Sequence, residues 1–591
     1  MLAPTVPMKR MSTLCAMAIS ASAMTAAAGA PDALDLVPAS TDMIVSIAHV
    51  SDFLNDVDQI NRALGPMGNN ELVFVTAMSR GMPGVNLNGS AAILVDFHDD
   101  PNAGVEPSAV ALIPVSDFAA FSQEREAVNG LVKMPLLEAN VFGRDVGHGF
   151  ALLGDDADAL RAFDTSDGNM KAHAARLGGA GGRLVGGAEV TIIVNADTMR
   201  PYLDAAKDGM DEQGQMVGMM GGEQAAQGFD AFSQLASGVM RDLQTGVVGL
   251  SVDSTGMSYD MAMQFKEGSA SAANFAKGGQ TDGLTDHLPS GPYMFALSLD
   301  TSSPAINNFA DAFDAMSADL PEEVRNQMGA AFGQMSLKDL TELTQGISFV
   351  MGATPGLMGG GLFANTTQYI KTDKPGAYRQ AMLSMMENAD GQSNQGMTIG
   401  TTVSPNAVTI DGTSLTAYGM KFTIDPDAAQ AMGGGMMPGM DPSMIMGMVF
   451  GPSGGPAGYI GEVKNGVVQT LTQGPTLTKN ALAAAASGEG LGTSERISRV
   501  ASTLHADRAA EIYIGVDEIL NTVGPMLMMF GVIPEFEPMD ALDPIAMAMT
   551  FDDGGLVGRI RVPMATFQTL LELMPNEAMN GGGGNDDGFD F

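Results

Sequence analysis

Two similar eight-residue stretches decide the fold of this chain: FGRDVGHG at residues 142–149 and YIGEVKNG at residues 459–466. Each starts with an aromatic residue and runs through charged residues into a glycine-containing turn. An apolar run follows each turn, from Phe150 to Leu153 in the first stretch and from Val467 to Leu471 in the second. Apolar runs joined by a short glycine-containing turn are typical of a β-hairpin. The two stretches therefore predict two hairpins of the same design.

Working outward from the hairpins, four segments share a second layout, in which a short apolar strand leads through a polar or turn residue into a helical run. These segments begin at Asp42, Glu189, Tyr293 and Glu511. A third layout, a strand that ends in proline before a helix, occurs at Pro114 and again at Pro563. Proline suits a helix start because its missing N–H would have no partner there. The layouts recur in one order, which indicates an internal duplication.

The expected fold class is α+β. We predict two homologous lobes, residues 31–283 and 284–575, each a mainly antiparallel sheet with helices packed on one face. The glycine-rich, polar stretch at residues 277–280 suits the boundary between them. Gly/Met-rich insertions interrupt the second lobe at residues 356–361 and 432–455. Residues 576–591 are glycine-rich and acidic, and we expect them to form a disordered tail.

The first thirty residues have the pattern of a secretory signal peptide. Lys9 and Arg10 precede an uncharged, weakly apolar stretch, which ends in the small-residue run AAAGA at residues 26–30. That order predicts export with cleavage near Ala28. Cys15 lies within the signal and is the only cysteine. Disulfides and cysteine-based chemistry are therefore not expected in the exported part, which would reside in the periplasm or outside the cell.

The composition is strongly acidic, with 68 Asp and Glu against 29 Lys and Arg and a formal net charge of −39. Such a surface repels nucleic acid and anionic membranes, both of which are bound through clustered Lys and Arg. No apolar run is long enough for a transmembrane helix in the mature chain. The absence of tryptophan and the few aromatic residues argue against a carbohydrate-stacking site.

Two groups of residues are candidates for a metal site. Asp96 and His98 alternate along a strand and so share one side of it, although the sequence that follows is also typical of an ordinary turn. Met436, Met437 and Met440 lie in a methionine-rich stretch, and thioethers are soft ligands for Cu(I). Because methionine is abundant along the whole chain, filling of core and loop space is the favoured interpretation. No cofactor is expected.

The nucleophile motif G-x-S-x-G is matched formally at residues 451–455. That motif works as a strand, a tight turn and a helix, whereas here it leads toward the strand predicted at residues 459–463. None of the six histidines has the spacing of a helical zinc site. The sequence therefore nominates no catalytic residue.

The opening LVPASTD at residues 36–42 and the stretches at residues 142–160 and 459–485 resemble a family of large exported bacterial envelope proteins of unknown function. The likeness covers most of the mature chain. It implies an envelope or periplasmic location and a two-lobed α+β fold. The family supplies no catalytic residues that could be carried over to this sequence.

The leading hypothesis from the sequence is a non-enzymatic exported protein that binds or scaffolds in the cell envelope. Its expected partner is an envelope protein or a small apolar ligand. One alternative is a hydrolase whose active site follows no known motif. The other is a Cu(I)-binding protein that uses the methionine-rich loops.

Overall fold

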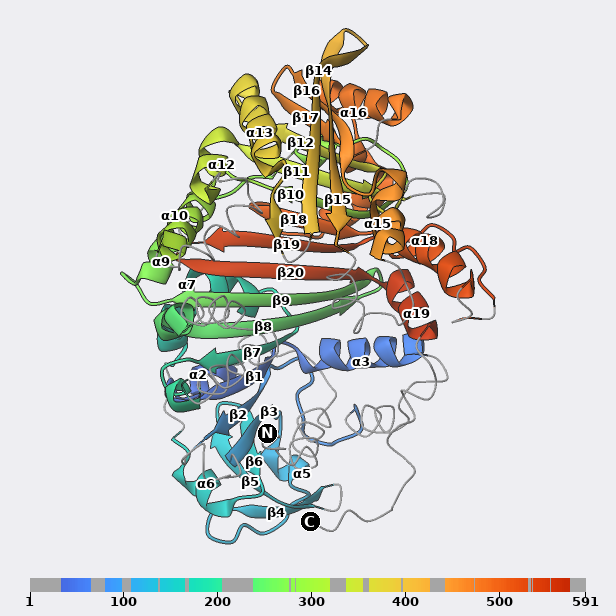
Figure 1. The fold of residues 1–591 in the computed structure, drawn as a ribbon. Helices are drawn as coiled ribbons and strands as arrows, with labels where there is room; N and C mark the ends of the chain where they lie inside the picture. The colour runs from blue at the N-terminus through green and yellow to red at the C-terminus, as the bar shows by residue number, and fades with distance from the viewer. Residues whose placement is uncertain are drawn as a thin grey trace. The chain divides into compact units, whose positions relative to one another are not determined.

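A computed structural model gives the fold (Figure 1). It describes residues 33–64, 80–97, 108–136, 139–164, 169–202, 204, 237–275, 278–281, 283–318, 336–353, 361–394, 397–425, 442–471, 474–529, 533, 535–552 and 554–573. These residues form helices and strands in a mixed order, and the strand pairs between them are antiparallel, as predicted. The chain divides into two compact units. Unit 1 comprises Met1–Ala205, Leu243–Gln264 and Val562–Phe591, and unit 2 comprises Ala206–Asp242 and Phe265–Arg561.

The sheet of unit 1 has the strand order β4-β5-β6-β3-β2-β1-β7-β8-β9. In chain order its strands are β1 (Met43–Ile47), β2 (Ala91–Asp96), β3 (Ser108–Pro114), β4 (Val132–Leu136), β5 (Ala139–Gly147), β6 (Phe150–Gly154), β7 (Val190–Asn195), β8 (Leu243–Asp253) and β9 (Gly256–Phe265). Its helices are α2 (Ala33–Leu36), α3 (Val50–Leu64), α5 (Phe118–Phe121), α6 (Ala157–Ala162), α7 (Met170–Val185) and α19 (Met564–Glu572).

The sheet of unit 2 has the strand order β14-β15-β16-β17-β12-β11-β10-β18-β19-β20. In chain order these are β10 (Tyr293–Leu299), β11 (Gly346–Gly352), β12 (Thr366–Lys371), β14 (Met397–Ile410), β15 (Thr413–Ile424), β16 (Ala457–Val463), β17 (Gly466–Thr470), β18 (Ala510–Ile514), β19 (Ile545–Asp552) and β20 (Gly555–Pro563), and β13 (Ser393–Asn394) pairs with β14. Its main helices are α10 (Pro304–Ala318), α12 (Leu337–Leu343), α13 (Pro375–Ala389), α15 (Pro442–Phe450), α16 (Pro475–Ser487), α17 (Glu495–Ala501) and α18 (Val516–Met529).

Both predicted hairpins are present, as β5–β6 and β16–β17. In the first, Phe142 pairs with Gly154, and in the second Tyr459 pairs with Thr470. The strand-to-helix layouts also form, for example β10 into α10 and β18 into α18. These elements were predictable because their patterns are local, a two-residue alternation for a strand and a proline at a helix start.

The central strands of the two units pair in the same register. In unit 1, Ile44 pairs with Leu94 on one side and with Ile193 on the other. In unit 2, Ala296 pairs with Val350 on one side and with Tyr513 on the other. Following the pairs outward, Leu112 faces Leu152, and Tyr369 faces Val468. Residues in the paired parts of β1, β2, β3, β6 and β7 therefore have register-equivalent residues in β10, β11, β12, β17 and β18.

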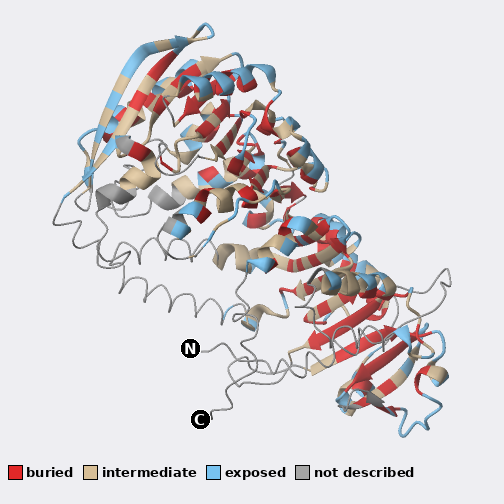
Figure 2. Cartoon of the chain, turned by 90° about the vertical axis from the view of Figure 1, so that its right-hand side faces the viewer, coloured by how far each residue is buried: buried red, intermediate tan, exposed pale blue. Residues whose placement is uncertain are grey.

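The prediction that the helices pack on one face of the sheet is wrong for unit 2, where helices cover both faces. Tyr369 and Val468 pack with residues of α16, whereas the next residue, Ile370, packs with residues of α13. Successive residues of a strand point to opposite faces, so α13 and α16 cover opposite faces of β12 and β17. Residues on both faces of these strands are consequently buried. Figure 2 colours the buried residues red.

Candidate functional site

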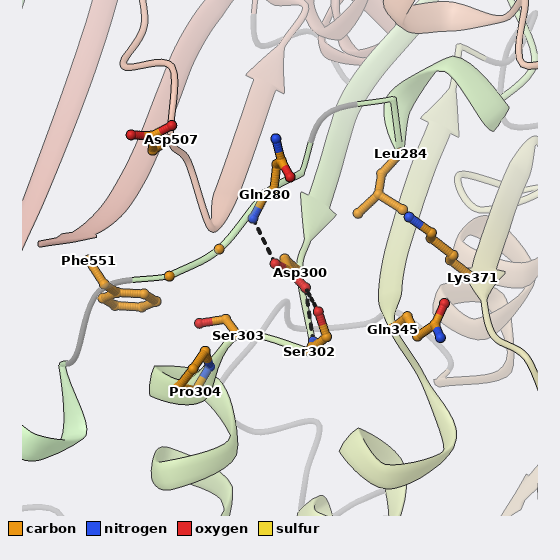
Figure 3. A pocket seen from close by; sticks show the side chains of 12 residues that line it. Gln280, Leu284, Asp300, Ser302, Ser303, Pro304, Gln345, Lys371, Asp507 and Phe551 are labelled. Atoms are coloured by element: carbon orange, nitrogen blue, oxygen red, sulfur yellow. Dashed lines mark hydrogen bonds between the residues drawn. The ribbon is translucent and has the colours of Figure 1, made fainter.

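A cavity of about 590 Å³ opens in unit 2 beside the first turn of α10 (Figure 3). It is lined by Gly278, Gly279, Gln280, Leu284, Asp300, Ser302, Ser303, Pro304, Gln345, Lys371, Asp507 and Phe551. These residues come from the segment before β10, the β10–α10 connection, the facing ends of β11 and β12, the approach to β18 and the end of β19. A cavity of this volume is in the range of small-molecule sites in proteins.

Asp300 organises the floor of the cavity. It directly follows β10, and its side chain is only 6% exposed. One carboxylate oxygen accepts hydrogen bonds from the backbone N–H of Ser302 (2.9 Å) and from its Oγ (2.6 Å), and the other accepts from the backbone N–H of Gln280 (2.7 Å). Three donors stabilise the buried carboxylate and compensate for its loss of water. Asp300 thereby ties the 278–281 segment to the start of α10.

Gly278 and Gly279 let that segment pass close to its neighbours. Their φ angles are +155° and +120°, which side chains rarely adopt. A Cβ on Gly279 would lie 2.3 Å from the Cβ of Ala509, and a Cβ on Gly278 would lie 2.9 Å from the Cδ of Pro304. Only glycine fits this close approach, so the cavity wall here is backbone.

Ser303 occupies the N-cap position of α10, because its carbonyl accepts from the N–H of Asn307 (3.0 Å). A serine at this position usually satisfies one of the first free N–H groups of the helix with its hydroxyl. Here the Oγ of Ser303 is buried without a hydrogen-bond partner among the described residues, and the residue is 2% exposed. The N–H groups of Ala305 and Ile306 likewise have no acceptor within the described part of the chain.

Charged and amide side chains complete the polar lining. Lys371 ends β12, and its carbonyl accepts from the N–H of Gln345 (2.8 Å). Its ammonium forms no ion pair with any described residue. Asp507, which is exposed, lies on another side of the opening (Figure 3). The apolar part of the lining comes from Leu284, Pro304 and Phe551.

A second polar cluster in unit 2 is saturated by its own partners. The buried carboxylate of Glu511 accepts from the Oγ1 of Thr285 (2.5 Å), the Nε of Arg508 (2.5 Å) and the Oη of Tyr513 (3.0 Å). Burial raises the pKa of Tyr513 well above its ordinary value, and the neighbouring Glu511 raises it further. Because its hydrogen-bonding capacity is used internally, this cluster stabilises the fold.

Unit 1 contains a group of carboxylates on α3 and the nearby strands. Burial, a hydrogen bond to Glu189 and the charges of Glu189, Asp52 and Asp253 together raise the pKa of Asp56 to about 8. One oxygen of Asp56 is buried and has no partner among the described residues. Elsewhere in this group the acceptors are occupied, since Glu189 accepts from the N–H of Val252 (3.2 Å).

Of the metal candidates from the sequence, the structure describes Asp96 alone. Asp96 ends β2, and its side chain accepts from the backbone N–H of Asp42 (3.2 Å). His98, Met436, Met437 and Met440 lie outside the described residues. Within the part of the chain that the structure describes, no group of three or more His, Cys, Asp or Glu side chains is arranged to hold a metal ion.

The G-x-S-x-G match forms a loop. Gly451–Ser453 is a short 3₁₀ turn, and the chain continues into β16. The Oγ of Ser453 lies within hydrogen-bond distance of the carbonyls of Phe450 (3.0 Å) and Gly455 (2.6 Å), and it can donate its single proton to either. A hydroxyl that closes its own loop in this way is not presented as a nucleophile, in agreement with the interpretation from the sequence.

His173 is a buried structural histidine. It is 0% exposed, its Nε2 bonds to the carbonyl of Val37 (2.8 Å), and its Nδ1 lies 3.0 Å from the guanidinium of Arg176. Because a guanidinium only donates, Nδ1 is the acceptor and the proton is on Nε2. Burial lowers the pKa of Arg176. The pair holds α7 to the segment before β1.

Sequence reasoning missed the cavity. The signal that could have indicated it is the run Asp300-Thr301-Ser302-Ser303-Pro304 directly after a predicted strand. Asp and Ser followed by Pro are typical of a helix start and reveal nothing about a nearby cavity. Gln345, Lys371 and Asp507 are distant in the sequence, and only folding brings them to the same opening.

Among the described residues, no helix is long and apolar enough to cross a membrane. No family model, curated protein sequence or solved structure matches the chain.

Proposed function

We propose that this chain is an exported, non-enzymatic binding protein and that the unit 2 cavity holds a small molecule. The observation that carries the proposal is the Oγ of Ser303, which is buried in the cavity lining and has no hydrogen-bond partner among the described residues. Burying a hydroxyl without a hydrogen bond costs free energy. A bound molecule that supplies an acceptor would recover that cost.

The register comparison supports a functional origin for the polar lining. Asp300 and Lys371 are register-equivalent to Ala48 and Pro114 of unit 1. The backbone contacts are alike, since the N–H of Asp300 donates to the carbonyl of Ala509 (2.8 Å) and that of Ala48 donates to the carbonyl of Glu189 (2.9 Å). The same strand arrangement therefore forms without the polar side chains, and architecture alone does not account for them.

A binding role fits the lining better than hydrolysis. Neither histidine nor cysteine is among the lining residues. The Oγ of Ser302 donates to Asp300, but the same carboxylate oxygen also accepts a backbone N–H. This is the hydrogen bonding of a turn that begins a helix, and it leaves the carboxylate a poor general base.

The binding proposal is tested with a variant that fills the cavity. Gln345 is exposed at its edge, so Gln345→Trp places a large side chain there without entering the core. Gln380→Trp is the matched control, because Gln380 is an exposed residue of α13 that does not line the cavity. Each protein is equilibrated with a small-molecule extract of the host cell, and the molecules it retains after desalting are identified by mass spectrometry.

We expect the wild type and Gln380→Trp to retain the same small molecule and Gln345→Trp to lose it. Retention of the same molecules by all three proteins, or of none by the wild type, would contradict the proposal. The melting temperature of each variant shows whether it is folded.

We also propose that residues 31–283 and 284–575 are homologous lobes that arose by duplication. The support is the common strand order and the common register at Ile44 and Ala296 and at Leu112 and Tyr369. A crystal structure in which the two sets of strands, β1–β7 and β10–β18, fail to superpose would refute this.

Export is the remaining part of the proposal and rests on the N-terminal pattern. In a bacterial host with a periplasm, the full chain should be recovered from the periplasmic fraction. Replacing Lys9 and Arg10 by Glu removes the positive charges that precede the apolar stretch. This variant should remain in the cytoplasm, and equal recovery of both forms from the periplasm would count against the signal.

A further inference from the structure

The donors left unused in the cavity indicate the chemistry of its ligand. The hydroxyl of Ser303 has no partner, and the N–H groups of Ala305 and Ile306 at the start of α10 have no acceptor among the described residues. Pro304, between them, has no N–H to offer. The first turn of a helix carries partial positive charge, which favours an anion.

Lys371 adds a full positive charge to the lining. Its ammonium is unpaired within the described residues although the chain carries 68 acidic residues. In so acidic a protein an unpaired lysine at a cavity is available for an external anion. Its register-equivalent in unit 1 is Pro114, so this charge belongs to unit 2 alone.

Two carboxylates also line the cavity, and their effects differ. The Asp300 carboxylate receives three hydrogen bonds from the protein, which offset its charge locally. Asp507 is exposed to water, so its repulsion of a bound anion is screened. Removing Asp507 leaves the hydrogen bonds of Asp300 intact and should strengthen binding of an anion slightly, most clearly at low salt.

We infer that the ligand of the unit 2 cavity carries an oxyanion, a carboxylate or a phosphate, that binds Ser303 at the start of α10 and that Lys371 attracts from another side of the cavity. The inference rests on the proposed function, that the cavity binds a small molecule. The ring of Phe551 and the side chain of Leu284 give the rest of the ligand an apolar surface. A small organic acid meets both conditions.

The test uses three probes of nearly equal size that differ in charge: benzoate, benzyl alcohol and protonated benzylamine. Their dissociation constants are measured by NMR titration of the full chain at neutral pH and low salt. We expect benzoate to bind about fivefold tighter than benzyl alcohol, as one exposed ion pair allows, and benzylammonium to bind most weakly. Added sodium chloride should weaken the binding of benzoate and leave the binding of benzyl alcohol unchanged.

Substitutions of lining residues identify which side chains determine the affinity for benzoate. Lys371→Gln should raise the dissociation constant of benzoate about fivefold. Lys371→Arg retains the positive charge and should leave that constant unchanged. Asp507→Asn should strengthen the binding of benzoate. Ser303→Ala should weaken the binding of benzoate and have little effect on the binding of benzylammonium. Benzylammonium binding best, or benzoate binding that Lys371→Gln leaves unchanged, would overturn the oxyanion inference.

The Gln345→Trp variant distinguishes small-molecule binding in the cavity from the preference for an oxyanion. If all three probes bind the wild type equally and none binds Gln345→Trp, the cavity is a binding site and the oxyanion inference fails. If no probe binds, or if Gln345→Trp binds the probes as tightly as the wild type does, the probes do not bind in the cavity and the oxyanion inference is wrong. Gln380→Trp should match the wild type throughout, and phosphate is then compared with benzoate to identify the preferred oxyanion.

Discussion

Lys371 at the end of β12 occupies the position in the sheet of unit 2 that Pro114, at the end of β3, occupies in the sheet of unit 1. Lys371 pairs with Gly466 of β17, and Pro114 pairs with Phe150 of β6. A proline there fills space and offers no donor, whereas the lysine places an ammonium at a cavity. Two sheets of the same register can thus differ in the chemistry that they present, because side chains at a strand end are not needed for pairing.

The first prediction compares two serines that precede helices. The hydroxyl of Ser303 has no partner in the part of the chain that the structure describes, while that of Ser336 accepts from the N–H of Asp339 in a capping box with α12. Ser336→Ala should therefore lower the free energy of unfolding of unit 2 by about 1 kcal/mol. Ser303→Ala should be neutral or slightly stabilising in the absence of ligand, because it removes an unsatisfied buried hydroxyl.

Chemical denaturation of both variants without ligand measures this difference. Equal destabilisation by the two substitutions would show that Ser303 caps α10 in solution and is not free for a ligand.

The second prediction concerns the buried histidine of unit 1. His173→Leu leaves the carbonyl of Val37 and an N–H of Arg176 without their partner. Leaving buried polar groups unpaired costs about 1–3 kcal/mol each, so the melting temperature of unit 1 should fall clearly. His49→Leu is the control, since His49 is exposed and its bond to Asn88 is long, at 3.3 Å.

Differential scanning calorimetry should show a lower melting temperature for His173→Leu and almost no change for His49→Leu. Similar melting profiles for the two variants would mean that the contacts of His173 contribute little.

The third prediction is a pH dependence that originates at Asp56. Its pKa is raised from 3.8 to about 8 in the folded protein, so the folded form binds a proton that the unfolded form has lost between these values. The free energy of unfolding should therefore fall as pH rises from about 4 to 8 and level off above pH 8. Asp56→Asn removes this contribution.

Melting temperatures measured from pH 5 to pH 9 check this. Asp56→Asn should lose less stability than the wild type as pH rises and should be the more stable protein at pH 9. Asp155→Asn, which changes an exposed residue after β6, should follow the wild type. A wild-type curve parallel to that of Asp56→Asn would mean that Asp56 does not hold its proton.

The fourth prediction follows from the net charge of −39. The repulsion among surface carboxylates is screened by salt, since the Debye length falls from about 30 Å at 0.01 M to about 8 Å at 0.15 M. The melting temperature should therefore rise as sodium chloride is added. Calcium should add little beyond its ionic strength because the sequence has no calcium-binding loop. A sharp rise at low calcium would reveal a specific site.

Much of the secondary structure was predictable because it depends on neighbours in the sequence. The hairpins at residues 142–153 and 459–471 followed from apolar runs around a glycine-containing turn, and β10 into α10 followed from an apolar run before a helical one. Which faces the helices cover was not predictable. α13 and α16 are both amphipathic, and the pattern within a helix does not say which side of a sheet it packs against.

The sequence by itself determined the strands, the turns, the order in which they recur and the excess of negative charge. Only the tertiary structure decided that Ser303, Lys371 and Asp507 line one cavity, because each is ordinary in its local context and they are far apart along the chain. It also decided that the hydroxyl of Ser303 finds no partner among the residues that the structure describes, whereas that of Ser336 has one. Hydrogen-bond satisfaction is a property of the packed structure, since the partners of a buried group come from elements that meet only on folding.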